Sequence, residues 1–214
     1  MFMEWRPSSS VHIWFLDTDL TKSAEYLPNY HLFKSITGCI QMLINARFYF
    51  IGIRNKTAYN YYFAKARKQE TYDRFFPNWP YPKPPKFSFY TSKTTKWARQ
   101  CNEHYQYLVS YLEILLLEYS YRFKKTHTGQ KFYDWLTSDA PDLHIPNANI
   151  REVTIPWKAL KKKYRNKDII LGYRNQMMGT FENDDPYKAY ANNGRDIPDF
   201  VVKHFHLDIA DMMA

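Results

Sequence analysis

The sequence predicts a mainly α-helical protein, with a single compact helical domain and a short strand element near the N-terminus. Residues 31–48 and 94–123 both place apolar side chains at the 3.6-residue spacing of an amphipathic helix. The 214 residues suffice for one domain with a substantial core, and 45% hydrophobic content argues against disorder. We therefore expect one domain over residues 11–214, preceded by a flexible leader at 1–10.

The individual elements follow from local signals. Residues 11–16 (VHIWFL) favour a short strand because they are apolar, β-branched and aromatic, and polar turn residues follow them. Five prolines exclude regular structure from residues 75–87, within a basic, proline- and aromatic-rich insert at 71–93. A loop is expected at 137–149. Helices or helical turns are expected at 23–26, 31–48, 57–69, 94–123, 131–136, 157–164, 187–192 and 198–213.

All of the surplus positive charge lies between residues 51 and 100. This segment holds 11 Lys and Arg residues against two acids (11 − 2 = +9), which equals the net charge of the whole chain, and it carries 13 aromatic residues. Cations bind phosphates and flat rings stack on bases, so the combination favours a nucleic-acid surface. The alternative is a solvated basic face whose rings belong to the core. The candidate nucleic-acid-binding residues are Arg54, Lys65, Arg67, Lys68, Lys93 and Lys96.

Two polar stripes on the predicted helices are candidate sites. The first has few charges and several neutral hydrogen-bonding groups, so it can form the wall of a polar cavity. It consists of His31, Lys34, Gly38, Gln41 and Asn45. A plain solvated face is the alternative for this stripe.

The second stripe runs beside a leucine seam and combines ionisable groups with aromatic rings. Buried ionisable groups are costly unless paired, and they tend to mark ion pairs or working sites. The stripe consists of Trp97, His104, Tyr111, Glu118 and Arg122. Its alternative interpretation is an exposed Glu118–Arg122 pair one helical turn apart.

Other chemistry-bearing residues are few. Asp17 and Asp19 follow the predicted strand, where a carboxylate can act as a base or metal ligand, although turn chemistry is the alternative. Cys39 and Cys101 lie in apolar helical patterns typical of free thiols in a reducing, intracellular compartment. No phosphate-binding glycine loop, serine-hydrolase motif or zinc-protease motif occurs. We expect no cofactor, with a divalent metal left open. No membrane partner is expected either, because the apolar runs are too short to span a bilayer and no signal peptide is recognisable.

Six short motifs occur in a consistent order between residues 11 and 192. They are F-L-D-x-D at Phe15–Asp19, H-x-x-K at His31–Lys34, Q-M-L at Gln41–Leu43, Trp97-Ala98-Arg99, E-Y-S-Y-R-F-x-K-x-H at Glu118–His127, and D-P-x-x-A-Y at Asp185–Tyr190. The set resembles a small phage-encoded family associated with DNA thymine hypermodification. Members of that family are predicted to act on pyrophosphorylated 5-hydroxymethyluracil in DNA.

This resemblance implies that an amine or amino acid displaces pyrophosphate from the 5-methylene carbon of a thymine-like base. The leaving pyrophosphate needs cations, for which the resemblance suggests Lys34, Arg99 and Arg122. The amine must lose a proton, which suits His31, His127, Asp17 or Asp19. The base, once flipped from the stack, needs a ring such as Trp97, Tyr121 or Tyr190, and Gln41 could contact its edge. Glu118 and Asp185 complete the candidate site.

One family motif is absent from the sequence. The family has T-H-x-x-H-P before the tryptophan-arginine element, whereas this chain has Tyr90-Thr91-Ser92-Lys93-Thr94, which puts the shared chemistry in doubt. The leading hypothesis is a DNA base-modifying transferase that works in the host cytoplasm during infection. The alternatives are a DNA glycosylase acting on a flipped base and a non-catalytic nucleic-acid-binding phage accessory protein.

Overall fold

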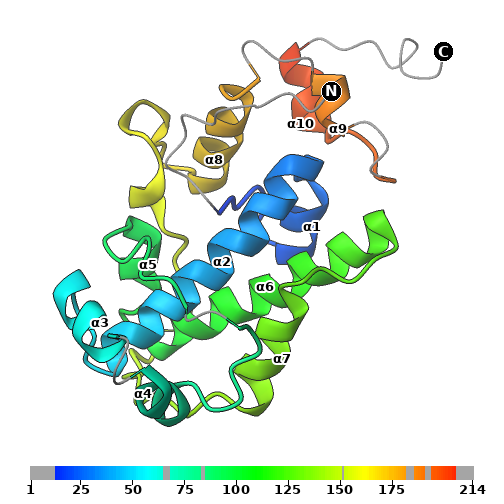
Figure 1. Cartoon of the computed structure of the whole chain (residues 1–214). Coiled ribbons are helices and arrows are strands. Elements are labelled where there is room, and N and C mark those ends of the chain that lie inside the picture. The colour runs from blue at the N-terminus through cyan, green and yellow to red at the C-terminus, as the bar shows by residue number, and fades with distance from the viewer. Residues whose placement is uncertain are drawn as a thin grey trace.

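The computed structural model describes residues 13–64, 68–82, 85–150, 152–181, 186–190 and 194–205. This part of the chain is mainly helical and contains no strand, which confirms the predicted fold class (Figure 1). Its α-helices are α1 (Leu20–Glu25), α2 (Asn29–Phe50), α3 (Lys56–Tyr62), α4 (Lys68–Phe75), α5 (Lys93–Ala98), α6 (Asn102–Phe123), α7 (Gln130–Ser138), α8 (Ile169–Met178), α9 (Pro186–Tyr190) and α10 (Asp199–Phe205). Two short 3-10 helices, η1 (Trp157–Ala159) and η2 (Lys162–Tyr164), precede α8.

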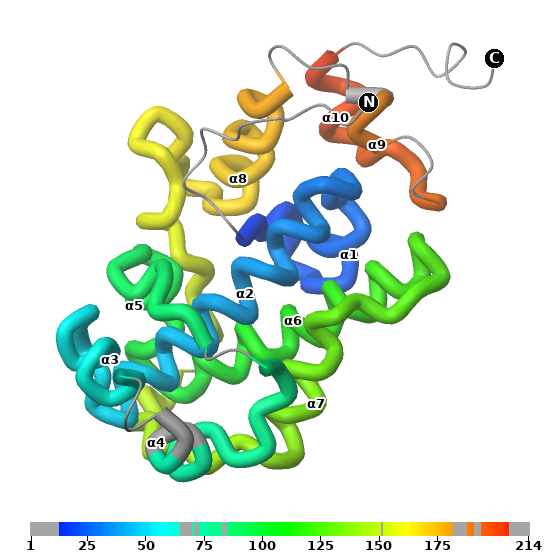
Figure 2. Tube along the Cα trace, viewed as in Figure 1, coloured from blue at the N-terminus to red at the C-terminus, as the bar shows by residue number. Residues whose placement is uncertain are grey.

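The two longest helices, α2 and α6, form the centre of the molecule. They pack against each other, and α1, α5 and α7 also pack against α6 (Figures 1 and 2). Their contact buries the apolar stripes that the sequence predicts, completely so for Leu32, Ile36 and Leu43 of α2 and for Leu108 and Leu112 of α6. Because every apolar side chain removed from water stabilises the fold, this pairing supplies the main core.

The predicted N-terminal strand is wrong. Its first two residues lie outside the described part of the chain, and the other four are buried but form no strand. Side chains satisfy their backbone groups: Leu16 N–H donates to Ser23 Oγ (2.8 Å), Arg174 Nε donates to the Leu16 carbonyl (2.7 Å), and the Tyr111 hydroxyl donates to the Trp14 carbonyl (2.6 Å). In a helical surrounding with no neighbouring strand, such side chains replace the ladder that a strand needs.

Two long predicted helices are each divided. The one expected at 94–123 is α5 followed by α6, because Cys101 is fully extended (φ −155°, ψ 166°) and Asn102 N–H donates to the Pro146 carbonyl (2.9 Å). The one expected at 57–69 is α3 and α4, and α3 already ends at Tyr62, with Phe63 as its C-cap. Helical periodicity survives such a break, so spacing alone did not reveal it.

The C-terminal third holds one helix that the sequence analysis missed. Asp168 caps α8 by accepting a hydrogen bond from Leu171 N–H (3.0 Å), but the apolar spacing of this helix is weak. The other expected elements are present with shifted ends as α1, α7, η1, η2, α9 and α10. The expected leader at 1–10 and the end of the last expected helix lie outside the described residues. No described helix is long and apolar enough to cross a membrane.

Candidate functional site

Most aromatic rings of the basic segment belong to the core. Phe63 and Phe76 are buried against Phe48, with ring centroids 5.9 and 5.7 Å away, and Trp79 packs on Trp135 at 4.9 Å. For Phe63 and Phe76 the core interpretation holds, because a buried ring has no surface to offer a base, and the half-buried Trp79 packs against the same core.

In or next to the basic segment, two tyrosine rings instead contact arginine side chains. The Arg54 guanidinium carbon lies 5.0 Å from the centroid of Tyr49, at the C-terminal end of α2. Arg99 lies 4.5 Å from Tyr49 and 4.6 Å from Tyr90, and it donates a hydrogen bond to the Tyr90 carbonyl (3.3 Å). We call these four residues the arginine–tyrosine cluster. The cluster comes from three segments that only the fold brings together, and each guanidinium is oriented by a ring.

The cluster is surrounded by cations that lack carboxylate partners. We define the basic face as Arg54, Lys56, Lys86, Lys93, Lys96 and Arg99, of which all but half-buried Arg99 are exposed. The ion pairs of the described residues join Arg122 with Glu118, Arg174 with Asp17, and Arg195 with both Glu25 and Glu118, so none involves the basic face. No ion pair among the described residues therefore neutralises a cation of this surface.

Three of the six predicted nucleic-acid-binding residues lie on the basic face, namely Arg54, Lys93 and Lys96. Lys68 is the first residue of α4. Lys65 and Arg67 lie outside the described residues. The predicted set therefore includes half of the basic face, but it lacks Tyr49 and Tyr90, the tyrosines that orient the two arginines.

The opposite end of α2 holds a buried polar network centred on Arg122. Arg122 Nε donates to Glu118 Oε1 (2.6 Å). Its two terminal nitrogens donate to the carbonyls of Leu27 (2.6 Å), Ala24 (3.1 Å) and Glu25 (3.0 Å) and to Asn29 Oδ1 (3.3 Å). A guanidinium has five N–H donors, and these five acceptors use all of them. Arg122 thus joins α6 to the α1–α2 junction and has no donor left for a pyrophosphate.

Glu118 is shared between two arginines. It is only 4% exposed, and Arg195 donates to both of its oxygens, at 3.1 Å from Nε and 2.7 Å from Nη2. Burial acts to raise the pKa of Glu118, but the hydrogen bonds and charges of Arg195 and Arg122 outweigh it and lower that pKa. The Glu118–Arg122 pair is therefore a buried ion pair and not the exposed one considered from spacing.

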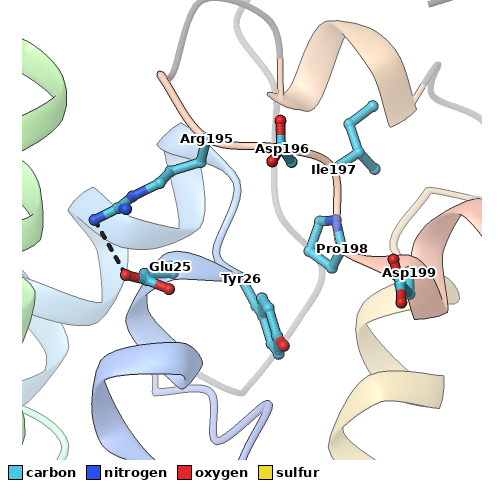
Figure 3. A pocket seen from close by; sticks show the side chains of 7 residues that line it. All are labelled: Glu25, Tyr26, Arg195, Asp196, Ile197, Pro198 and Asp199. Atoms are coloured by element: carbon cyan, nitrogen blue, oxygen red, sulfur yellow. Dashed lines mark ion pairs between the residues drawn. The ribbon is translucent and has the colours of Figure 1, made fainter.

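A polar hollow of about 270 Å³ opens beside this network (Figure 3). Figure 3 shows Arg195 reaching toward Glu25, whose oxygen lies 3.2 Å from Arg195 Nη2. The lining residues are Glu25, Tyr26, Arg195, Asp196, Ile197, Pro198 and Asp199. The hollow therefore combines three carboxylates with one guanidinium and one aromatic ring.

Several predicted site residues surround the α1–α2 junction beside this hollow. Tyr190 is buried, and its hydroxyl donates to the Tyr26 carbonyl (2.8 Å). Arg195 stacks over the exposed Tyr121 ring at 4.0 Å. Asp17 pairs with Arg174 (3.0 Å). Arg195 and Arg174 connect these residues, and no sequence spacing pointed to either of them.

The two early aspartates perform turn chemistry. Asp17 Oδ1 accepts from Asp19 N–H (3.1 Å), and Asp19 caps α1 by accepting from Thr21 N–H (2.8 Å) and Lys22 N–H (3.3 Å). These hydrogen bonds account for the presence of both aspartates in the turn. Turn chemistry is the alternative that the sequence left open for them.

The two predicted histidines are enclosed by aromatic rings. His31 is 6% exposed and lies 5.3 Å from Trp14, and burial together with the charge of Lys34 lowers its pKa to about 4. His127 is buried against Tyr119 (4.7 Å), accepts from Gly129 N–H at Nδ1 (2.9 Å), and has its pKa lowered by burial. Both rings are therefore neutral near pH 7.

The remaining candidates have separate positions. Lys34 is half-buried, with its ammonium 5.3 Å from the Tyr30 ring, and Gln41 is half-buried one turn before Asn45. Trp97 is buried, stacks on His104 at 4.5 Å and donates from Nε1 to the Thr154 carbonyl (2.6 Å), so its ring is not open to a base. Asp185 lies outside the described residues.

Many of the predicted residues thus lie toward one or the other end of α2, with Gln41 near its middle. This helix has 22 residues, so its own length is about 33 Å at 1.5 Å per residue. Within the described residues, no group of three or more His, Cys, Asp and Glu side chains is arranged to hold a metal ion. No family model, curated protein or solved structure matches this chain.

Proposed function

We propose that this protein binds DNA through the basic face. The observation that supports this function is the arginine–tyrosine cluster, where Arg54 and Arg99 are oriented by Tyr49 and Tyr90 and no described carboxylate pairs with either arginine. Arg122 and Arg174, which join separate parts of the fold, each have an acidic partner. Cations held in place without one are suited to an external anion.

A phosphate backbone is the anion that fits an extended cationic surface. Lys93 and Lys96 project from α5, which Arg99 terminates, so one short element presents three cations. Binding to such a row of cations releases counterions from the nucleic acid and supplies affinity that is independent of base sequence. The resemblance to thymine-modifying phage proteins favours DNA over RNA.

Anisotropy of a labelled DNA duplex, measured over a series of salt concentrations, tests this proposal. The double variant R54A/R99A should bind more weakly, and the slope of log K against log salt should fall by about 2 if each arginine contacts one phosphate. The matched control is K125A/K131A, which removes two exposed cations, one just after α6 and one in α7, that are not part of the basic face. Equal affinities and slopes for the two double variants would exclude the basic face as the DNA site.

A second candidate function, the base-modifying transferase, is favoured by the polar hollow. Glu25, Asp196 and Asp199 can hold an ammonium group, while Arg195 can face a carboxylate, so a small amino acid fits the charges of the lining. In the proposed reaction a lining carboxylate first accepts one proton from the ammonium group, which frees the lone pair of the amine nitrogen. That nitrogen bonds to the 5-methylene carbon as the bond from this carbon to the pyrophosphate oxygen breaks, pyrophosphate leaves to solvent, and the new secondary ammonium group releases its extra proton to water. A DNA segment of about ten base pairs matches the length of α2, which runs between the basic face and the hollow.

Mass spectrometry of nucleosides tests the transferase. DNA containing the pyrophosphorylated base should yield a heavier nucleoside only when an amine donor is added, and E25Q/D199N should lose that product without weaker DNA binding. A glycosylase would instead leave abasic sites and free base, but turn and ion-pair contacts already engage Asp17 and Asp19. As a phage enzyme, the protein would act in the host cytoplasm during infection.

A further inference from the structure

The segment around η1 and η2 carries a second concentration of positive charge. Residues 157–167 contain six Lys and Arg residues and no Asp or Glu (6 − 0 = +6) in eleven positions. These cations are Lys158, Lys161, Lys162, Lys163, Arg165 and Lys167, and all six are exposed. Acids elsewhere in the C-terminal third cancel this charge in the overall sum, which is why the charge count along the chain did not show it.

A tryptophan lies in the middle of this charge. The Trp157 side chain is 44% exposed, whereas the other described tryptophans are buried or half-buried. The Lys158 ammonium and the Arg165 guanidinium each lie 5.5 Å from the Trp157 ring. An exposed indole is costly to leave in water, and two adjacent cations place phosphate-binding groups beside it.

The segment is held firmly against the rest of the fold. Leu160 is buried, Lys161 N–H donates to Gln176 Oε1 (2.7 Å), and the Tyr173 hydroxyl donates to the Pro156 carbonyl (3.1 Å), so α8 supports the segment from beneath. Gly172 allows the close approach, because a Cβ there would lie 2.7 Å from the Tyr164 carbonyl oxygen. The exposed cations and the Trp157 ring are therefore attached to a backbone that buried contacts with α8 hold in place.

This surface adjoins the basic face. The η1 helix packs against α5, and Trp97 of α5 is tied to the Thr154 carbonyl just before η1. Figure 1 shows the yellow segment that contains η1 and η2 between α5 and α8. A nucleic-acid chain that contacts Lys93 and Lys96 can thus continue onto Lys158 without leaving the protein surface.

We propose that the η1–η2 segment is a subsite for single-stranded nucleic acid, in which one unpaired base stacks on Trp157 and the surrounding lysines bind the adjoining phosphates. The charge of the segment is the reason to choose nucleic acid as its partner. The proposal rests on the proposed function only in assuming that the same nucleic acid also contacts the basic face. A duplex keeps its bases stacked inside and offers an indole only its backbone, whereas a single strand offers each base a free face. The proposal therefore adds strand selectivity to the proposed function.

Fluorescence anisotropy with a labelled oligothymidine of about 20 nucleotides and with a duplex of equal length tests this subsite. W157A should bind the oligothymidine about tenfold more weakly and the duplex with nearly unchanged affinity, because only stacking is removed. W157F should recover most of the loss. K161A/K162A should lower the single-strand salt slope by about 1.4, whereas K125A/K131A should leave it unchanged.

The outcomes separate this subsite from the basic face. Unchanged oligothymidine binding by both W157A and K161A/K162A overturns the subsite, even where R54A/R99A weakens binding as expected. Loss in W157A without loss in R54A/R99A supports the subsite and overturns the proposed function of the basic face. Equal losses on duplex and single strand for W157A overturn strand selectivity. Trp157-dependent binding to phosphatidylserine vesicles, without Trp157-dependent oligonucleotide binding, overturns nucleic acid as the occupant.

Discussion

The arginines at the two ends of α2 differ in their partners. At the N-terminal end, Arg122 is buried, paired with Glu118 and bonded through all five of its N–H donors. At the C-terminal end, Arg54 and Arg99 rest on tyrosine rings, and no carboxylate of the described residues pairs with them. The same residue type is therefore structural where its donors are satisfied internally and suited to binding where they are not.

This difference has a thermodynamic consequence. A buried charge is tolerated only with its partners present. Removing one partner leaves the other charge buried and unpaired, and its desolvation then destabilises the fold. A cation on a half-exposed ring is already hydrated, so its removal costs the fold little. Variants at the two ends of α2 should therefore separate stability from binding.

The largest expected effect is at Glu118. E118A should lower the free energy of unfolding by about 3–5 kcal/mol, because the buried Arg122 would lose its carboxylate and Arg195 would keep only Glu25. Urea denaturation measures this change. The matched control is E113A on the same helix, where the exposed carboxylate should contribute within about 0.5 kcal/mol. If E118A lowered the free energy of unfolding by less than about 1 kcal/mol, the network of Arg122 would not contribute substantially to stability.

The next effect concerns His31 and pH. Its folded pKa of about 4 lies below the ordinary 6.5, so the unfolded chain takes up a proton first as the pH falls. Stability should thus be greatest above pH 6.5 and decline toward pH 4, by up to about 3 kcal/mol from this residue. Urea midpoints between about pH 7 and 5 isolate the histidines from the carboxylates, which titrate lower.

H31Q provides the control for this pH dependence. The variant should be less dependent on pH than the wild type over the same interval. His104 and His127, whose pKa values are also lowered by burial, would supply the remaining dependence. Identical pH profiles for H31Q and the wild type would show that His31 is not buried in its neutral form.

A smaller effect is expected at the basic face. R54A/R99A should change the free energy of unfolding by no more than about 0.5 kcal/mol, while it weakens duplex binding about tenfold. R99K keeps the charge but loses the planar stacking on Tyr49 and Tyr90, so it should recover only part of the affinity. Thermal unfolding and anisotropy on the same preparations measure both quantities. A large loss of stability would mean that the arginine–tyrosine cluster is structural, like the network of Arg122.

The smallest effect is at the rim of the polar hollow. Arg195 and Glu25 have side chains that are 27% and 31% exposed, so their ion pair is well hydrated. E25Q should cost about 0.5 kcal/mol, and the cost should shrink in high salt. Denaturation at two salt concentrations checks this. A salt-independent loss comparable to that of E118A would place Glu25 within the buried network.

Part of the candidate site could be predicted from the sequence. The stripe of Glu118 and Arg122 follows from helical spacing, and the structure brings both residues together in the core. Arg54, Lys93 and Lys96 follow from local charge, and they lie on one face. Spacing could not distinguish a saturated guanidinium from an available one, because four of the five acceptors of Arg122 belong to residues more than ninety positions away.

The long helices α2 and α6 could be read from the amino-acid sequence, since the periodic spacing of their apolar side chains is a local property. Three other features depend on the fold as a whole: residues 13–16 form no strand, Arg195 completes the pairing of Glu118, and Tyr49 contacts Arg99. These outcomes depend on partners distant in the chain, and the free energy of a polar group is set by which partners surround it once water is removed.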